Sequence, residues 1–285
     1  MKFGPVPTAE AEGTILAHSV VLAGRRLRKG RVLSGEDVAV LAAEGIASLT
    51  VARLEPGDVG EDEAAARIAA ALAPDPAGLG LAVQAPFTGR VNLHAAETGV
   101  LRVDAEAVRR LNAVDEAVTL ATLPDLSRVS ARDMVATVKI LPYAVPGRVV
   151  DAAADLLAAD PPLRLHRVAR RSADIIATRI SGMKPSVIEK GFGAIRTRLA
   201  ALGVTVASET VTGHETEALR AALGQAEAEM ILILGGSATQ DRGDVGPAAL
   251  IAAGGRIERF GMPVDPGNLL FLGALGDRPV IGLPG

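Results

Sequence analysis

The residues best suited to bind a charged ligand follow an apolar run in the last quarter of the chain. Residues 230–234 (Met-Ile-Leu-Ile-Leu) are typical of a fully buried strand, and Gly235, Gly236 and Ser237 come directly after them. Glycines leave main-chain N–H groups open to an anion, because no Cβ blocks its approach. Pro247 then marks the expected start of a helix. Strand, glycine turn and helix start together predict a phosphate-binding loop.

Two acidic residues in the same loop, Asp241 and Asp244, could hold a divalent cation or accept hydrogen bonds from a ligand amine. The sequence has no Cys, and its four His residues show no metal-ligand spacing, so a metal would be bound by oxygen. This favours Mg²⁺ over Zn²⁺. Simpler interpretations stay open, because Asp244 could cap the helix and Gly-Gly could be only a tight turn.

Two further segments complete a pattern with this loop. Residues 262–268 read Met-Pro-x-x-Pro-Gly-Asn, and residues 282–285 read Gly-Leu-Pro-Gly. Together with Gly-Gly-Ser and the two aspartates, this order resembles the molybdopterin-binding domain shared by molybdopterin molybdotransferases and molybdopterin adenylyltransferases. The resemblance covers about residues 165–285. In that family more chain follows Gly-Leu-Pro-Gly, so we expect the sequence to be cut short at this end.

The resemblance implies a role in molybdenum-cofactor biosynthesis. The cofactor would be molybdopterin or its nucleotide form, and the activity would be molybdate insertion or cofactor delivery. Asp241 and Asp244 would be the catalytic residues and would hold Mg²⁺. The resemblance also implies that ten residues contact the cofactor: Gly182, Lys184, Gly235, Gly236, Ser237, Ala238, Thr239, Pro266, Gly267 and Asn268.

Several positions depart from the family pattern. His214-Glu215 stands where an acidic pair is expected, and Asp265 and Asn268 stand where basic residues are expected. These changes support ligand binding more than catalysis, so the sequence leaves open whether the protein is an enzyme. One alternative is a nucleotide pyrophosphatase of the competence-damage-inducible type, which would need a metal-bound water at the loop aspartates. Another is a non-catalytic carrier or sensor. His214 itself is expected at the surface.

The segments that position the loop alternate between strands and helices. Strands are predicted at 174–180, 204–211 and 230–234. Two helices are predicted to begin at capping boxes, Ser186 with Glu189 and Thr212 with Glu215. The alternation predicts an α/β fold with a doubly wound, mostly parallel sheet and flanking helices. Ligands bind such sheets beyond the carboxyl ends of the strands.

A β-rich region precedes this domain. We place it at residues 1–163, with two small modules at about 1–60 and 81–145, and the α/β domain at 164–285; Asp160 and two prolines mark the boundary. Ser34 and Asp37 predict a capping box, and Asp104 predicts the cap of a helix over 105–111. Strands are predicted at 81–85, 90–94, 100–103, 117–123 and 134–141. This half carries no evident ligand chemistry, which favours a scaffold or a homo-oligomer interface.

Composition limits the remaining classes of function. Aromatic residues make up 2% of the chain and the net charge is −3, which argues against base stacking and a large nucleic-acid footprint. No apolar run approaches the ~20 residues of a membrane span, and the first residues lack the apolar region of a secretory signal. We therefore expect a cytoplasmic protein with a small-molecule ligand, without nucleic-acid or membrane partners.

Overall fold

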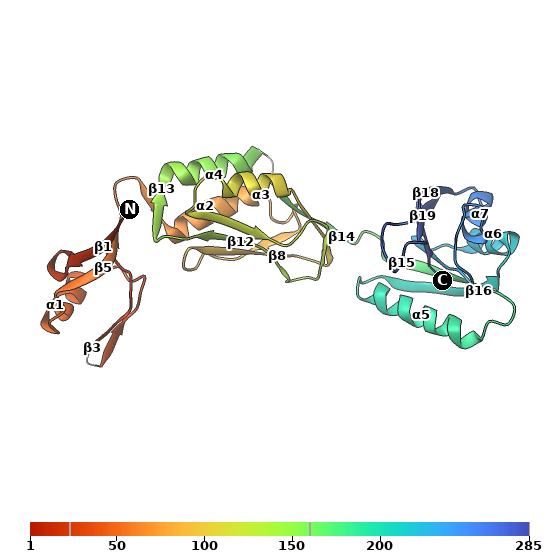
Figure 1. The fold of residues 1–285 in the computed structure, drawn as a ribbon, viewed down its shortest axis with the longest axis horizontal. Coiled ribbons are helices and arrows are strands. Elements are labelled where there is room, and N and C mark those ends of the chain that lie inside the picture. The colour runs from red at the N-terminus through yellow and green to blue at the C-terminus, as the bar shows by residue number, and fades with distance from the viewer. Residues whose placement is uncertain (23, 160, 285) are drawn as a thin grey trace. The chain divides into compact units, whose positions relative to one another are not determined.

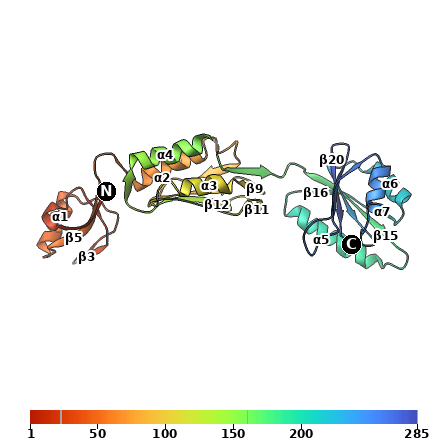
Figure 2. The ribbon, with the colours of Figure 1, turned by 45° about the horizontal axis from the view of Figure 1, so that its top comes forward.

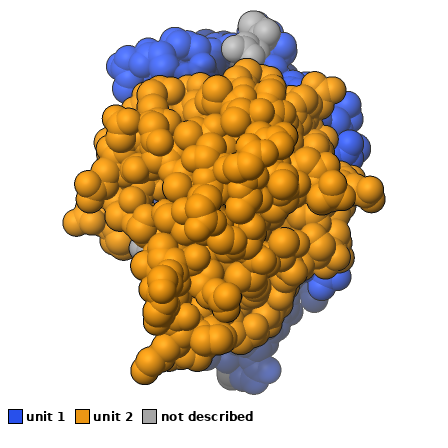
Figure 3. Space-filling model, turned by 90° about the vertical axis from the view of Figure 1, so that its right-hand side faces the viewer, with its two compact units in different colours: residues 1–167 blue, residues 168–285 orange. Residues whose placement is uncertain are grey.

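The protein, seen in a computed structural model, is described over residues 1–22, 24–159 and 161–284. It divides into two compact units, Met1–Arg167 and Val168–Gly285 (Figure 3). Asp160, predicted at the domain boundary, and the final glycine of Gly-Leu-Pro-Gly lie outside the described residues. Within the described ranges, no helix combines the length and the hydropathy that a membrane span requires.

The N-terminal unit begins with a small sheet, a hairpin and a helix. Strands β1 (Lys2–Pro7), β5 (Ser48–Arg53) and β2 (Ile15–Leu16) form the sheet, and β3 (Val20–Leu22) pairs with β4 (Arg25–Leu27). The short helix η1 (Thr8–Glu10) follows β1. Helix α1 (Gly35–Ala43) begins at the predicted capping box, which confirms that part of the sequence analysis. The buried Asp37 carboxylate also accepts hydrogen bonds from Arg25 and Arg31, so it joins the hairpin to the helix.

The rest of this unit is a mixed layer of strands and helices. Strands β10 (Val118–Thr122), β12 (Met134–Ile140), β8 (Arg90–Ala95) and β7 (Leu81–Val83) form one sheet in that order. Helices α2 (Glu61–Leu72), α3 (Ala105–Asn112) and α4 (Gly147–Ala159) lie over one face of this sheet (Figure 1). Strands β11 (Ser127–Val129), β9 (Gly99–Val103) and β14 (Leu163–Arg167) form a three-stranded sheet in that order. Strand β13 (Ala144–Pro146) pairs with β6 (Asp58–Gly60) in a two-stranded sheet. Asp104 caps α3 as predicted.

The C-terminal unit is built on a six-stranded sheet in the order β16-β15-β17-β20-β19-β18. Its strands are β15 (Ser172–Arg179), β16 (Thr205–Gly213), β17 (Met230–Leu234), β18 (Arg256–Phe260), β19 (Phe271–Leu275) and β20 (Arg278–Leu283). The first four strands in the order are parallel, and β19 and β18 continue the sheet antiparallel. The mostly parallel α/β sheet predicted from the sequence is therefore confirmed.

Three helices cover the two faces of this sheet. Helix α5 (Pro185–Ala200) packs on one face against Ile175 of β15 and Leu232 of β17. Helices α6 (Thr216–Gln225) and α7 (Val245–Ala252) pack on the other face against Ile176 and Ile233. Figure 2 shows β15, β16 and β20 of this sheet together with the helices α5, α6 and α7. Neighbouring strand residues point to opposite faces, so both faces of the central strands are apolar, as a doubly wound sheet requires.

Two of the predicted capping boxes are wrong. Helix α5 has Lys184 at its N-cap and Pro185 as its first residue, so Ser186 lies inside the helix. Proline suits the first helical position because its fixed φ is already helical. Thr212 belongs to β16, where strand pairing with Thr178 extends the sheet past the expected end, and α6 begins after Glu215.

A buried carboxylate joins three segments of the C-terminal sheet at the end opposite the loop at residues 235–244. Asp174, 3% exposed, accepts hydrogen bonds from the Ser208 hydroxyl and from the N–H groups of Glu227 and Ala228. Burial alone would raise the pKa of Asp174, but these hydrogen bonds and the charge of Arg278 lower it below its ordinary value. Asp174 thus ties the chain before β17 to β15 and β16.

Candidate active site

The carboxyl ends of the parallel strands meet at one edge of the C-terminal sheet. The strand register places Ala177 of β15 beside Leu234 of β17, and Leu234 beside Leu283 of β20. On the other side, Thr178 of β15 lies beside Thr212 of β16. Residues 180–184, 214–215 and 235–244 therefore leave the sheet next to one another, which is where ligands bind in such folds.

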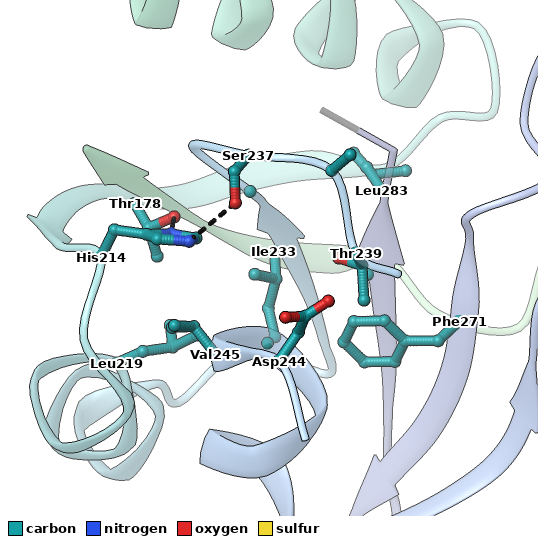
Figure 4. A pocket seen from close by; sticks show the side chains of 14 residues that line it. Thr178, His214, Leu219, Ile233, Ser237, Thr239, Asp244, Val245, Phe271 and Leu283 are labelled. Carbon is teal, nitrogen blue, oxygen red and sulfur yellow. Dashed lines mark hydrogen bonds between the residues drawn. The ribbon is translucent and has the colours of Figure 1, made fainter. Parts of the chain in front are cut away.

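His214 links the ends of three strands, although we expected it at the surface. Its Nδ1 lies 2.8 Å from Thr178 Oγ1 and its Nε2 lies 2.9 Å from Ser237 Oγ (Figure 4). The N–H of Gly236 donates to the same Thr178 hydroxyl at 2.8 Å. This chain of hydrogen bonds holds the glycine turn against β15 and β16. Its signal in the sequence was only that His214 follows a strand at the same edge as Ser237.

The positions of the protons along this chain follow from the acceptors present. Thr178 is 2% exposed, and its Oγ1 already accepts the Gly236 N–H. Within the described residues, His214 Nδ1 is the acceptor left for the Thr178 hydroxyl hydrogen. In the tautomer that fits this acceptor, the ring carries its proton on Nε2 and donates it to Ser237 Oγ. Ser237, which is exposed, therefore keeps its own hydroxyl hydrogen free for a ligand oxygen.

The main chain after the glycines offers donors as well. In the described part of the chain, the N–H groups of Ser237, Ala238 and Thr239 make no hydrogen bond. These three N–H groups and the free Ser237 hydroxyl are therefore donors that remain available to a ligand. Such an arrangement suits an oxyanion, and phosphate above all.

The two loop aspartates are engaged within their own loop. Asp244 Oδ2 accepts the N–H groups of Gln240 at 2.6 Å and Asp241 at 2.9 Å, and Asp241 Oδ1 accepts the N–H of Gly243 at 2.7 Å. Asp244 occupies the N-cap position of α7, but its carboxylate binds the preceding loop instead of the helix. The N–H groups of Asp241 and Gln240 hold the pKa of Asp244 below its ordinary value.

Close packing by itself requires a glycine at position 236. A Cβ there would lie 2.7 Å from the carbonyl oxygen of Thr178, so only glycine lets the turn approach the end of β15. The ring of Phe271, which is 1% exposed, likewise leaves little room for a side chain at two nearby glycines. It lies against Gly246 and Gly282, where a Cβ at Gly282 would overlap the ring.

The glycine turn separates two cavities. One is lined by Thr178, His214, Ser237, Thr239 and Asp244, among others, and its volume of about 10 Å³ suits a single water molecule (Figure 4). The other, of about 240 Å³, lies on the α5 side and is lined by Ala177, Thr178, Met183, Val187, Ile188, Gly191, Leu234, Gly235 and Gly236. Only the second cavity has room for part of an organic ligand.

The structure thus gathers some of the predicted site residues and leaves others apart. Gly235, Gly236, Ser237, Ala238, Thr239 and Asp244 line these two cavities. Neither cavity is bordered by the remaining six: Gly182, Lys184, Asp241, Pro266, Gly267 and Asn268.

Each of these outer positions has its own local setting. Lys184 is exposed at the start of α5, and Gly182 makes the left-handed turn before it, with φ at +80°. The segment with Asn268 closes on itself, because Met262 N–H donates to the Asn268 carbonyl. Arg242, which the sequence analysis did not single out, lies over the Phe260 ring at 5.6 Å from its centroid.

Comparisons with known proteins add little to this site. A family model described as a domain of unknown function (DUF8806) matches residues 5–53, within the N-terminal unit. The comparison with curated proteins found no match.

Three solved structures share limited similarity with the chain. A molybdopterin biosynthesis protein from Pyrococcus horikosii is 13% identical, covers 100% of this chain and 70% of its own, and has a TM-score of 0.32. A molybdenum cofactor biosynthesis protein from Pyrococcus furiosus is 13% identical, with a TM-score of 0.24. This chain covers 57% of that protein's length, and the match takes in 99% of this chain. A nicotinate-nucleotide pyrophosphorylase from Francisella tularensis is 11% identical, covers 69% of this chain and 90% of its own, and has a TM-score of 0.21. Similarity at this level does not assign a function.

Proposed function

We propose that the C-terminal unit binds molybdopterin, or its nucleotide form, in molybdenum-cofactor biosynthesis. The observation that carries the proposal is the set of donors after the glycine turn: the N–H groups of residues 237–239 and the Ser237 hydroxyl, which His214 orients. These donors suit the phosphate of the cofactor. The order of motifs in the sequence supports the identity of the rest of the ligand.

The pterin ring would lie in the apolar cavity on the α5 side of the turn. Met183, Ile188 and Leu234 line it, and Gly235 and Gly236 form the wall towards the phosphate site. Apolar walls favour the faces of a flat ring system, while the main-chain donors at one end fix its orientation. Lys184 and Arg242 would add positive charge to the same edge of the sheet without touching the ring.

The loop aspartates have few oxygens left to hold a metal, and this favours delivery of the cofactor over a metal-dependent hydrolysis. One oxygen of Asp241 and one of Asp244 accept main-chain N–H groups, which leaves one oxygen on each. No group of three or more acidic or His residues that could hold a metal is found in the described residues. A Mg²⁺ ion here would therefore depend on ligand phosphate and water for most of its coordination. The ion would neutralise phosphate charge.

Ser237→Ala is expected to weaken molybdopterin binding about tenfold, or about 1.4 kcal/mol, because it removes the oriented donor. Thr178→Val should have a similar effect, since the valine can neither accept from Gly236 nor hold His214. Thr178→Ser should bind like the wild type. Anaerobic titration of molybdopterin measures the affinity of each variant, and a thermal melt measures its stability.

Ser186→Ala is the matched control, because Ser186 is exposed on α5 and borders neither cavity. Wild-type affinity in folded Ser237→Ala and Thr178→Val would show that the turn has only a structural role. Metal-dependent hydrolysis of ADP-ribose by the wild type would instead favour the nucleotide pyrophosphatase.

A further inference from the structure

The N-terminal unit contains a cavity that the proposed function does not use. Its volume is about 530 Å³, which falls in the range of small-molecule sites. Its walls include apolar and charged side chains: Phe3, Lys29, Glu61, Lys139, Leu141 and Tyr143. The sequence analysis found no ligand chemistry in this half of the chain, because these residues are far apart in the sequence.

Glu61 provides a carboxylate to this cavity, with an ion pair to Lys139 as its charged contact. It is the first residue of α2, and its side chain is 22% exposed. Its charged neighbour Lys139 has Nζ at 3.8 Å, beyond hydrogen-bond distance, because that ammonium donates to the carbonyl of Thr88 instead. In the described residues, no donor makes a hydrogen bond to the Glu61 carboxylate. A half-buried carboxylate in this state is ready to accept N–H groups from a ligand.

The pKa values of Glu61 and Tyr143 are shifted in the direction that burial of these side chains requires. Burial, partly offset by the charge of Lys139, raises the pKa of the Glu61 carboxyl above its ordinary value. Burial and the charge of Glu61 likewise raise the pKa of Tyr143. A ligand that brings N–H donors to Glu61 would offset the cost of desolvating the carboxylate.

Aromatic and apolar surface is left open beside this carboxylate. The whole chain has five Phe and one Tyr, and two of these six, Phe3 and Tyr143, line the cavity. Phe3 is 58% exposed and Leu141 is 59% exposed, so much apolar surface faces solvent. Rings placed in this way stack against a planar ligand. Lys29 and Lys139 outnumber Glu61, so the lining favours a ligand that also carries negative charge.

We propose that this cavity binds a small planar molecule with an N–H donor for Glu61 and an anionic group for Lys29. The ring of the ligand lies between the exposed face of Phe3 and the apolar wall at Leu141 and Tyr143. The site belongs to the N-terminal unit alone and stands whether or not the C-terminal unit binds a pterin.

A test with 4-aminobenzoate as probe uses the single tyrosine of the chain. In protein labelled with ¹³C-tyrosine, all ring signals come from Tyr143, which lines the cavity. We expect saturable shifts of these signals with 4-aminobenzoate at millimolar concentration. Benzoate, which lacks the N–H donor, and aniline, which lacks the anion, should each bind at least tenfold more weakly.

Variants of the chain give the second arm of the test. Glu61→Leu and Lys29→Met should each weaken 4-aminobenzoate binding at least tenfold. Glu63→Leu is the matched control, because Glu63 is an exposed glutamate in the same helical turn. Equal binding of the three probes to the wild type, or no shift of the Tyr143 signals, would overturn the proposal even if Glu61→Leu fails to fold. Wild-type affinity in folded Glu61→Leu would overturn it as well.

Discussion

Gly236→Ala is expected to lower the free energy of unfolding of the C-terminal unit by about 2 kcal/mol or more. The added Cβ would lie 2.7 Å from the Thr178 carbonyl oxygen and 3.3 Å from the Ile180 nitrogen. Both are backbone atoms at the end of β15, so they cannot turn aside as a flexible side chain would. The turn must move, and the hydrogen bond from Gly236 N–H to the Thr178 hydroxyl moves with it.

Gly193→Ala is the control for this experiment. Gly193 lies inside α5 with open space where its Cβ would be, so alanine there should stabilise the unit by up to about 1 kcal/mol. Urea-dependent hydrogen exchange in peptides from β15 and β17 would measure both variants in the full chain. If glycine at 236 served only to admit a phosphate, Gly236→Ala would unfold like the wild type and differ only in binding.

Asp174→Asn is expected to destabilise the same unit by about 3 kcal/mol at neutral pH. Oδ1 of the carboxylate accepts from the Ser208 hydroxyl, and Oδ2 accepts from two main-chain N–H groups. An asparagine keeps one oxygen for the two N–H groups only if the Ser208 hydroxyl turns to accept from the amide, and the negative charge that strengthens all three hydrogen bonds is lost. The exposed Asp277, whose side chain makes no hydrogen bond with the described residues, provides the control. Asp277→Asn should change the stability by less than about 0.5 kcal/mol.

The pH dependence gives a second readout for Asp174. Its pKa is lowered in the folded protein, so its contribution is complete above the ordinary carboxyl pKa of about 4 and is lost as the pH falls through the folded value. The difference in unfolding free energy between the wild type and Asp174→Asn should therefore shrink below about pH 4. A difference that stays constant down to acid pH would show that the lost interaction is not ionic.

Local sequence signals determined the elements of this protein. The apolar run at 230–234, the capping box at Ser34 and the cap at Asp104 all depend on residues within a few positions of one another. Alternation of such strands and helices also determined the parallel sheet, because parallel neighbours need a crossover between them. The position of residues 235–244 beyond the carboxyl ends of the strands follows from that topology.

Only the tertiary structure decided what the loop residues do. The hydrogen bonds of His214 with Thr178 and Ser237 join residues 36 and 23 positions apart, and the contact between Gly236 and Thr178 spans 58. The carboxylate of Glu61 and the ring of Phe3 meet at one cavity in the same way. No local pattern encodes these pairs, because they depend on strand register and on which side chain fills the space between neighbouring strand ends. The sequence therefore predicted the loop, while its hydrogen-bond donors, its packing and the cavity of the N-terminal unit came from the fold.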